Sequence, residues 1–204
     1  MFDRHLRGFK DRSLDAMAGW VGRYLSPGAL TWIGLGFGLA SAWASWRGIY
    51  DWGFLLFGFN RLMDGLDGAA ARIHGRSTDF GGLLDILFDF IAYAAVAVGL
   101  ALSRPEAEGV LPAALFMMAA FYVNAAAWMY LSAVLEKRAM GASHRGERTT
   151  VAMPEGFIGG TESMLVYAAF FFIPGHLRIA FGAFAVMVGL TIVQRLIWAK
   201  RALG

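Results

Sequence analysis

Six apolar segments, each about as long as a membrane-spanning helix, follow one another along this chain of 204 residues. A helix needs about 20 apolar residues to cross the hydrocarbon core of a bilayer. The segments lie near residues 28–49, 52–73, 79–102, 110–135, 157–173 and 177–198. Hydrophobic residues make up 58% of the chain and charged residues only 16%, whereas a soluble domain has about 25% charged residues. We therefore expect an all-α integral membrane protein with six transmembrane helices, and we exclude a soluble enzyme or a disulfide-bonded secreted domain.

The first 25 residues follow a different pattern. Phe2, Leu6 and Phe9 recur at helical intervals, and charged residues fill most of the positions between them. This pattern is typical of an amphipathic helix that lies in the membrane interface. A solvated helix packed against the body of the protein is the alternative. The predicted organisation is an interfacial helix at residues 1–25 followed by one transmembrane domain at residues 26–204.

Basic residues are distributed unevenly between the predicted connections. If the N-terminus is cytoplasmic, 14 of the 18 lysines and arginines lie on the cytoplasmic side and three lie on the opposite side. Cytoplasmic loops of membrane proteins carry such an excess of lysine and arginine. We therefore expect both termini on the cytoplasmic side.

Four aspartates lie inside the second and third apolar segments: Asp64, Asp67, Asp85 and Asp89. Members of each pair are three or four residues apart, so they share one face of a helix. A carboxylate at the bilayer centre costs roughly 2.5–3.5 kcal/mol, and the two nearby arginines cannot balance four of them. Two Mg²⁺ or Mn²⁺ ions could, because these ions prefer oxygen ligands. The alternatives are pairing with basic residues elsewhere, or a path for protons or ions as in a divalent-ion transporter.

The aspartates belong to a longer pattern, Asp64-x2-Asp67-Gly68-x2-Ala71-Arg72-x8-Gly81-x3-Asp85-x3-Asp89. It resembles, at every constrained position, the signature of the CDP-alcohol phosphotransferase family, the membrane enzymes of phospholipid headgroup transfer. The stretch Ser26-Pro27-Gly28-x2-Thr31 is also similar to the family's Thr-Pro-Asn-x2-Thr stretch, with glycine in place of asparagine.

The resemblance implies six transmembrane helices behind an interfacial helix, as the apolar segments also indicate. It implies that Asp64, Asp67 and Asp85 hold two divalent ions against the diphosphate of CDP-diacylglycerol or a similar CDP-linked lipid. Asp89 would complete the metal site and act as general base toward the hydroxyl of a polar alcohol, with release of CMP. Family members are commonly homodimers, and no nucleic-acid partner is expected.

Several further residues are candidates for binding the CDP-linked lipid. The small residues Gly68, Ala71 and Gly81 would let a nucleotide approach the helix backbone closely. Arg61 is expected to form a salt bridge to a motif aspartate, whereas Arg72 could contact phosphate or simply follow the positive-inside bias. The candidates are Thr31, Arg61, Gly68, Ala71, Arg72 and Gly81.

The residues that bind the acceptor alcohol are harder to identify. A phosphorylated acceptor requires a basic pocket. The positive-inside bias is the favoured explanation for each loop arginine taken singly, whereas for Arg195 the alternative to a functional role is snorkelling of its side chain toward the interface. The fifth segment begins with Glu155 and Glu162, where phosphate-acceptor relatives often carry arginine, so we expect an unphosphorylated alcohol; helix capping is the alternative role for both glutamates. Inositol phosphate or glycerol phosphate is the alternative acceptor. The candidates are Arg138, Arg148, Glu155, Glu162 and Arg195, with Arg145 in the same loop as Arg148.

Gly34, Gly36 and Gly38 superficially resemble a dinucleotide-binding loop. They lie inside an apolar segment and follow no predicted strand, so we expect them to allow close packing of helices instead.

Overall fold

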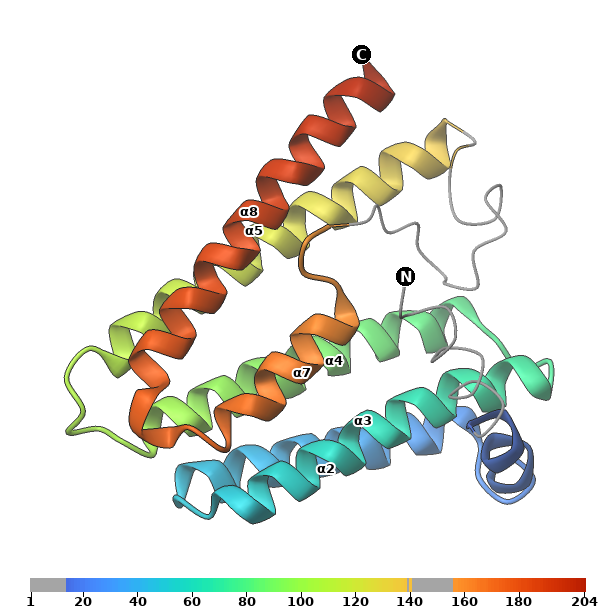
Figure 1. Ribbon diagram of the computed structural model, residues 1–204. Coiled ribbons are helices and arrows are strands. Elements are labelled where there is room, and N and C mark those ends of the chain that lie inside the picture. Colours follow the sequence, from blue (N-terminus) through green and yellow to red (C-terminus); the bar gives the residue numbers. More distant parts are fainter. Residues whose placement is uncertain (1–13, 139, 141–155) are drawn as a thin grey trace. The chain divides into compact units, whose positions relative to one another are not determined.

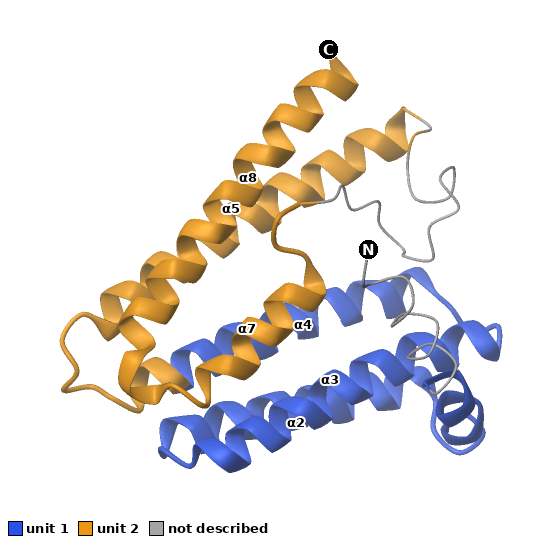
Figure 2. Cartoon of the chain, in the orientation of Figure 1, with its two compact units in different colours: residues 1–99 blue, residues 100–204 orange. Residues whose placement is uncertain are grey.

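The computed structural model describes residues 14–138, 140 and 156–204, and these residues form helices joined by short turns (Figure 1). The helices are α2 (Pro27–Trp46), α3 (Tyr50–Ile73), α4 (Asp79–Leu102), α5 (Val110–Lys137), α7 (Gly160–Phe170), the 3₁₀ helix η1 (Pro174–His176) and α8 (Leu177–Leu203). The described part of the chain contains no strand, which confirms the all-α prediction. The chain divides into two compact units, residues 1–99 and residues 100–204 (Figure 2).

The helix boundaries in the first unit follow the local sequence. Ser26 precedes α2, and its hydroxyl accepts a hydrogen bond from the backbone amide of Ala29 at 3.2 Å, while Pro27 occupies the first helical position. Proline is favoured there because that amide has no partner within the helix. Gly48 and Gly75 adopt positive φ angles of 74° and 63° directly after α2 and α3, a conformation that glycine adopts without steric cost.

Small residues allow the helices of the first unit to approach closely. A Cβ atom added to Gly34 would lie 3.2 Å from the Cβ of Met63, and one added to Gly38 would lie 2.8 Å from the Cβ of Ala92. Gly36 has open space at the same position. Close packing is therefore confirmed for Gly34 and Gly38, whereas Gly36 faces away from the neighbouring helices.

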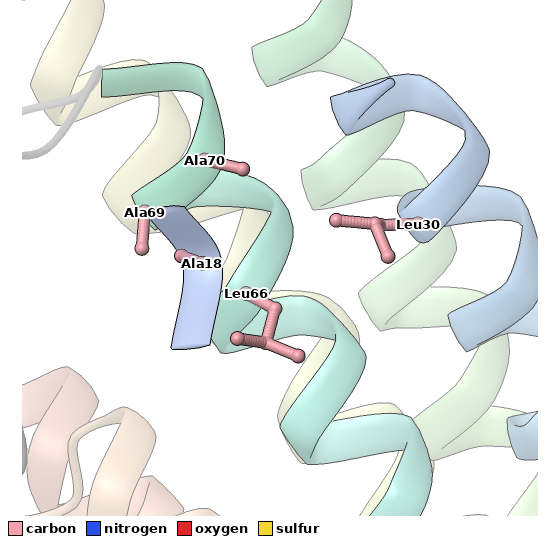
Figure 3. Packing of buried hydrophobic residues seen from close by; sticks show 5 residues of the cluster. All are labelled: Ala18, Leu30, Leu66, Ala69 and Ala70. Atoms are coloured by element: carbon pink, nitrogen blue, oxygen red, sulfur yellow. The ribbon is translucent and has the colours of Figure 1, made fainter. Parts of the chain in front are cut away.

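A helical segment at residues 14–21 packs against the ends of α2 and α3. Ala18 of this segment is fully buried in a cluster with Leu30, Leu66, Ala69 and Ala70 (Figure 3). The predicted interfacial helix is therefore helical in its described part, which contacts the body of the unit. Residues 1–13 of that prediction lie outside the described residues.

Aromatic side chains form the core of the second unit, where α5 and α7 pack on α8. Phe170 and Phe181 meet edge to face with ring centroids 5.0 Å apart, and Phe184 lies against both Phe121 and Tyr167. Aromatic pairs prefer such tilted and edge-to-face arrangements. All five side chains come from α5, α7 and α8, so the cluster joins these three helices.

Three described helices are long and apolar enough to cross a membrane: Asp79–Leu102, Val110–Lys137 and Pro174–Leu203. Helices α2 and α3 occupy the first two predicted spans, but their serine, tryptophan and aspartate side chains lower their mean hydropathy. The fifth predicted span, 157–173, is shorter in the structure, because α7 has only 11 residues and extends about 16 Å at 1.5 Å per residue. Large apolar side chains cover the outside of the protein, including Phe116 at 61% and Ile179 at 71% exposure. An integral membrane protein accounts for both observations.

Candidate active site

The four aspartates of the motif line a single pocket in the first unit. The pocket has a volume of about 10 Å³, which is close to the minimum that holds one water molecule. Its lining residues are Thr31, Gly34, Leu35, Asn60, Asp64, Asp67, Asp85, Phe88 and Asp89. Helix α3 supplies Asp64 and Asp67, and α4 supplies Asp85 and Asp89. The spacing of each pair on one helix face therefore brings all four carboxylates together, as the sequence predicts.

Asp67 is the most deeply buried of the four, with 4% of its surface exposed. Its carboxylate interacts with the backbone amide of Gly68 and lies beside the hydroxyl of Thr31, which donates a hydrogen bond to the carbonyl of Pro27 at 3.0 Å. The second oxygen, Oδ2, is buried without a hydrogen-bond partner among the described residues. A buried polar atom in this condition is costly, so it indicates a position for a bound cation or donor.

Arg61 is the cation that the structure places beside this pocket. Its Nη2 atom lies 2.6 Å from Asp89 Oδ1, and its Nη1 atom lies 3.7 Å from Asp64 Oδ2. The guanidinium also lies over the rings of Tyr93 and Phe57, at 4.7 Å and 5.7 Å from their centroids. The predicted salt bridge between Arg61 and a motif aspartate is confirmed, and it involves two of them.

Asn60 is a site residue that the sequence prediction missed. Its side chain is 4% exposed, accepts hydrogen bonds from Arg61 and donates one to the carbonyl of Gly34. The sequence signal that could have identified Asn60 is an asparagine next to an arginine within an apolar segment, because buried amides require hydrogen-bond partners.

The other candidates for lipid binding lie around this pocket rather than in its lining. Gly68 and Ala71 are half-buried on α3, and Arg72 is exposed at the end of α3, with its Nη1 atom 3.3 Å from the position of a Cβ on Gly68. The amide of Gly81 donates to the Thr78 hydroxyl at 3.0 Å, which caps the start of α4. Of the predicted lipid-binding residues, only Thr31 lines the pocket.

The residues of the pocket suit a divalent cation in chemical type. Carboxylate oxygens are the donors that Mg²⁺ and Mn²⁺ prefer. In the part of the chain that the structure describes, Arg61 pairs with two of the four carboxylates, those of Asp64 and Asp89. Within the described residues, no group of three or more His, Asp or Glu side chains is arranged to hold a metal ion without rearrangement. The two-ion site therefore stays a prediction, which the donor set and the unpartnered Asp67 Oδ2 favour.

The predicted acceptor residues have different roles in the second unit. Glu162 accepts a hydrogen bond from the amide of Gly159 at 3.0 Å and so caps α7, the alternative that the sequence left open. Arg138 is exposed and donates to the carbonyl of Leu203 at 3.0 Å. Arg148 and Glu155, together with Arg145, lie outside the described residues.

Arg195 is buried, with 4% exposure, and lies on α8 close to the polar residues Thr191 and Gln194. Its Nη1 atom donates to Asn124 Oδ1 at 2.7 Å, and its Nε atom has no partner among the described residues. Two neighbours on α8, Thr191 and Gln194, accept hydrogen bonds from the amides of Ile158 and Phe157. The segment before α7 is therefore attached to the same stretch of α8 that carries Arg195.

Comparisons with known proteins agree with these features. The family model for CDP-alcohol phosphatidyltransferases matches residues 24–198. The inner membrane protein YnjF of Escherichia coli (strain K12) is 29% identical over 178 residues, which cover 86% of this chain and 82% of that protein.

Solved structures of phosphatidylinositol phosphate synthase (PgsA1) from Mycobacterium tuberculosis are similar over almost the whole chain. The structure with CDP-DAG bound has a TM-score of 0.70 and 26% identity, covering 91% of this chain and 92% of that one. The structure in complex with manganese and citrate has a TM-score of 0.68 and 26% identity, covering 90% and 87% of the two chains.

Proposed function

Because the chain belongs to the CDP-alcohol phosphatidyltransferase family, we propose that it transfers a phosphatidyl group from CDP-diacylglycerol to an unphosphorylated polar alcohol. Membership makes the chain a membrane-bound transferase of phospholipid synthesis. One observation carries the proposal: four aspartates from α3 and α4 line one pocket beside Arg61. That arrangement suits metal-assisted phosphoryl chemistry. The choice of CDP-diacylglycerol is supported by the similar synthase that binds CDP-DAG.

Asp64, Asp67, Asp85 and Asp89 are the residues that would hold two divalent ions, and the manganese-bound relative supports this assignment. Such ions, when bound, neutralise the diphosphate and stabilise the departing CMP. Thr31 on α2 lies beside the carboxylate of Asp67, and Gly68 and Ala71 leave the adjoining face of α3 open for the nucleotide. Arg72 and Gly81 flank that face and would complete the contacts with the donor lipid.

Asp89 is the proposed general base. It accepts the proton of the acceptor hydroxyl while the hydroxyl oxygen forms a bond to the lipid-linked phosphorus. The bond from that phosphorus to the bridging oxygen of CMP breaks, and CMP departs with that oxygen and the electron pair. Arg61 keeps the carboxylate of Asp89 oriented through its contact with Oδ1.

An unphosphorylated acceptor is supported by the acidic residues that begin the fifth predicted segment, although Glu162 also caps α7. One observation favours a second candidate, a phosphorylated acceptor: Arg195 is buried with an unpartnered Nε atom. A guanidinium in this condition is suited to a phosphate group. The similar protein PgsA1 is a phosphatidylinositol phosphate synthase, and the phosphate in that name also supports a phosphorylated acceptor.

We also propose that all six predicted apolar segments cross the bilayer, the fifth as the short helix α7 together with the residues on either side of it, with both termini and the aspartate pocket on the cytoplasmic side. The support is the excess of lysine and arginine on that side. A homodimer is the expected assembly.

The test measures CMP release from CDP-diacylglycerol by the purified protein with Mn²⁺ or Mg²⁺. Serine, inositol, inositol phosphate, glycerol phosphate, choline and ethanolamine are supplied separately as acceptors. Asp85→Asn and Asp89→Asn should each reduce turnover by at least about a hundredfold. Asp79→Asn is the matched control, because Asp79 is exposed in the first turn of α4 and does not line the pocket. Near-normal turnover in Asp89→Asn would refute the proposed site, and metal flux without a need for CDP-lipid would indicate a transporter.

A further inference from the structure

Asn60 links three helices of the first unit through the arginine beside the pocket. We propose that Asn60 is a positioning residue for the transfer reaction: its carboxamide holds the Arg61 guanidinium against Asp89, so that one oxygen of Asp89 stays in that contact and the other serves the acceptor hydroxyl. This inference rests on the proposed function of Asp89. Asn60 itself touches neither the proton nor the phosphorus.

The hydrogen bonds of Asn60 leave it a single orientation. Its Oδ1 atom accepts from Arg61 Nε at 2.9 Å and from Arg61 Nη2 at 2.6 Å, while its Nδ2 atom donates to the Gly34 carbonyl at 2.8 Å. A flipped amide would place its NH₂ group against the guanidinium and its oxygen against the carbonyl, which are two unfavourable contacts. The backbone of α2 therefore fixes the amide, and the amide fixes the guanidinium.

The same guanidinium atom joins Asn60 to the catalytic carboxylate. Arg61 Nη2 donates both to Asn60 Oδ1 and to Asp89 Oδ1, each at 2.6 Å. Only Oδ1 of Asp89 is engaged by Arg61, so Oδ2 lies outside this contact. A carboxylate held through one oxygen in this way is restrained in direction. Because each carboxylate oxygen has two lone pairs, Oδ1 can serve both Arg61 and a metal ion, which leaves Oδ2 for proton transfer.

Aromatic rings hold the guanidinium from its faces. Tyr93 is one helical turn after Asp89 on α4, and its ring centroid lies 4.7 Å from the guanidinium carbon; Phe57 lies 5.7 Å away from α3. The Arg61 side chain is only 11% exposed, so water does not compete strongly with these contacts. Arg61 is therefore held at its edge by Asn60 and at its face by the rings.

The neutrality of Asn60 matters for this role. A carboxylate at this position would compete with Asp89 for the guanidinium, whereas a carboxamide supplies an acceptor without adding charge. Asp64 also attracts Arg61, because its Oδ2 atom lies 3.7 Å from Arg61 Nη1. Without Asn60, the guanidinium could move toward Asp64, and the orientation of Asp89 would be lost.

The experiment compares Asn60→Leu with Ser41→Ala in the full-length protein. Leucine has the same branched arrangement of side-chain heavy atoms as asparagine, with bulkier methyl groups, but accepts no hydrogen bond from Arg61. Ser41 is the matched control, because its hydroxyl donates to the Gly53 carbonyl at 2.7 Å and so forms another buried side-chain bond between α2 and α3, without contacting Arg61. Steady-state CMP release, thermal unfolding in detergent and Mn²⁺ binding followed by electron paramagnetic resonance are measured for both.

We expect Asn60→Leu to lower kcat by about tenfold to a hundredfold. KM for CDP-diacylglycerol and the Kd for Mn²⁺ should both stay within about threefold, since misplacing a catalytic group slows the reaction without weakening binding. Ser41→Ala should also lower the unfolding temperature, by less because it removes one hydrogen bond and not three, and should leave kcat unchanged. Arg61→Lys tests the contact between Asn60 and Arg61 by changing Arg61 instead of Asn60. Lysine keeps the charge but cannot reproduce the paired Nε and Nη2 contacts. This variant should lower kcat to a similar extent.

The proposal is overturned if Asn60→Leu folds and keeps kcat within about twofold of the wild type, or if the loss matches that of Ser41→Ala. Should Asn60→Leu not fold, normal kcat in Arg61→Lys overturns it equally. These outcomes are distinguishable from failure of the proposed function, which is decided by Asp89→Asn. An inactive Asp89→Asn with a fully active Asn60→Leu would remove the positioning role and leave the transferase assignment standing.

Discussion

Arg61 in the first unit and Arg195 in the second are both largely buried, each beside an asparagine, and the surroundings of the two arginines differ. Arg61 in the first unit contacts Asn60 and two carboxylates, those of Asp64 and Asp89. Arg195 in the second unit contacts Asn124, and the described residues place no carboxylate within 4 Å of it. The first arginine is neutralised within the protein, whereas the second is held only by an amide.

This difference separates two uses of a buried cation. A charge buried in a membrane protein is costly and is kept where it is paired or functional. Arg61 offsets the repulsion among the aspartates and orients one of them, so its role is internal to the site. Arg195 has an unpartnered donor that a ligand with negative charge or several hydroxyl oxygens could satisfy, so its role depends on the acceptor.

The largest effect on stability is expected for Arg61→Met. Removal of one partner from a fully buried ion pair costs about 3–5 kcal/mol; this pair is partly buried, since the side chains of Asp64 and Asp89 are 34% and 37% exposed, so we expect a loss on the order of 2–3 kcal/mol. The free energy of unfolding should fall by that amount in thermal or chemical unfolding in detergent. Added Mn²⁺ should restore more stability to the variant than to the wild type, because the cation replaces the lost charge. A variant as stable as the wild type without Mn²⁺ would contradict the view that Arg61 balances the aspartates.

A smaller effect is expected for Asn124→Ala. The substitution removes the acceptor at 2.7 Å from Arg195 and leaves a buried guanidinium with a further unpartnered donor, which costs about 1–3 kcal/mol. The loss should appear in the unfolding temperature of the variant. The kcat for CMP release should stay near the wild-type value, in contrast to Asn60→Leu. An equal fall in kcat for both asparagine variants would remove the distinction between the two arginines.

The sequence predicted the pocket well and the supporting contacts poorly, for a physical reason. Helical periodicity places Asp64 with Asp67, and Asp85 with Asp89, on one face each, so their convergence requires only that α3 and α4 pack together. The partners of Asn60 and Arg195 come from residues 26 and 71 positions away. No local pattern specifies such pairs, although each buried polar residue signals that a partner exists.

The same reasoning applies to the fold. Continuous apolar segments predicted α4, α5 and α8 closely, because length and hydropathy act locally. The fifth segment was predicted too long: α7 spans only Gly160–Phe170, and the chain turns before the 3₁₀ helix at Pro174. Hydropathy alone does not show where a helix stops when the apolar sequence continues through the turn.

A still smaller effect is expected for Glu162→Ala. The carboxylate caps α7 through the Gly159 amide, and loss of such a cap costs about 0.5–2 kcal/mol in proteins generally, with exposed caps near the lower end. If capping is its only role, KM for the acceptor should not change. A tenfold increase in acceptor KM at nearly unchanged stability would instead place Glu162 in acceptor binding, as the sequence first suggested.

The smallest effect on stability is expected for Arg195→Met. Methionine fills a comparable volume without a charge. Among the described residues, removal of Arg195 takes no partner from a carboxylate, so only the bond to Asn124 is lost. The free energy of unfolding should change by about 1 kcal/mol or less, whereas a larger loss is expected for the same substitution at Arg61.

The kcat/KM of Arg195→Met with each acceptor then tests whether Arg195 binds a phosphate group of the acceptor. With an unphosphorylated alcohol as the true acceptor, kcat/KM should stay within about threefold, because no charge-assisted bond to phosphate is lost. A loss of tenfold or more, seen only with inositol phosphate or glycerol phosphate, would establish the phosphorylated acceptor and assign the unpartnered guanidinium donor to its phosphate.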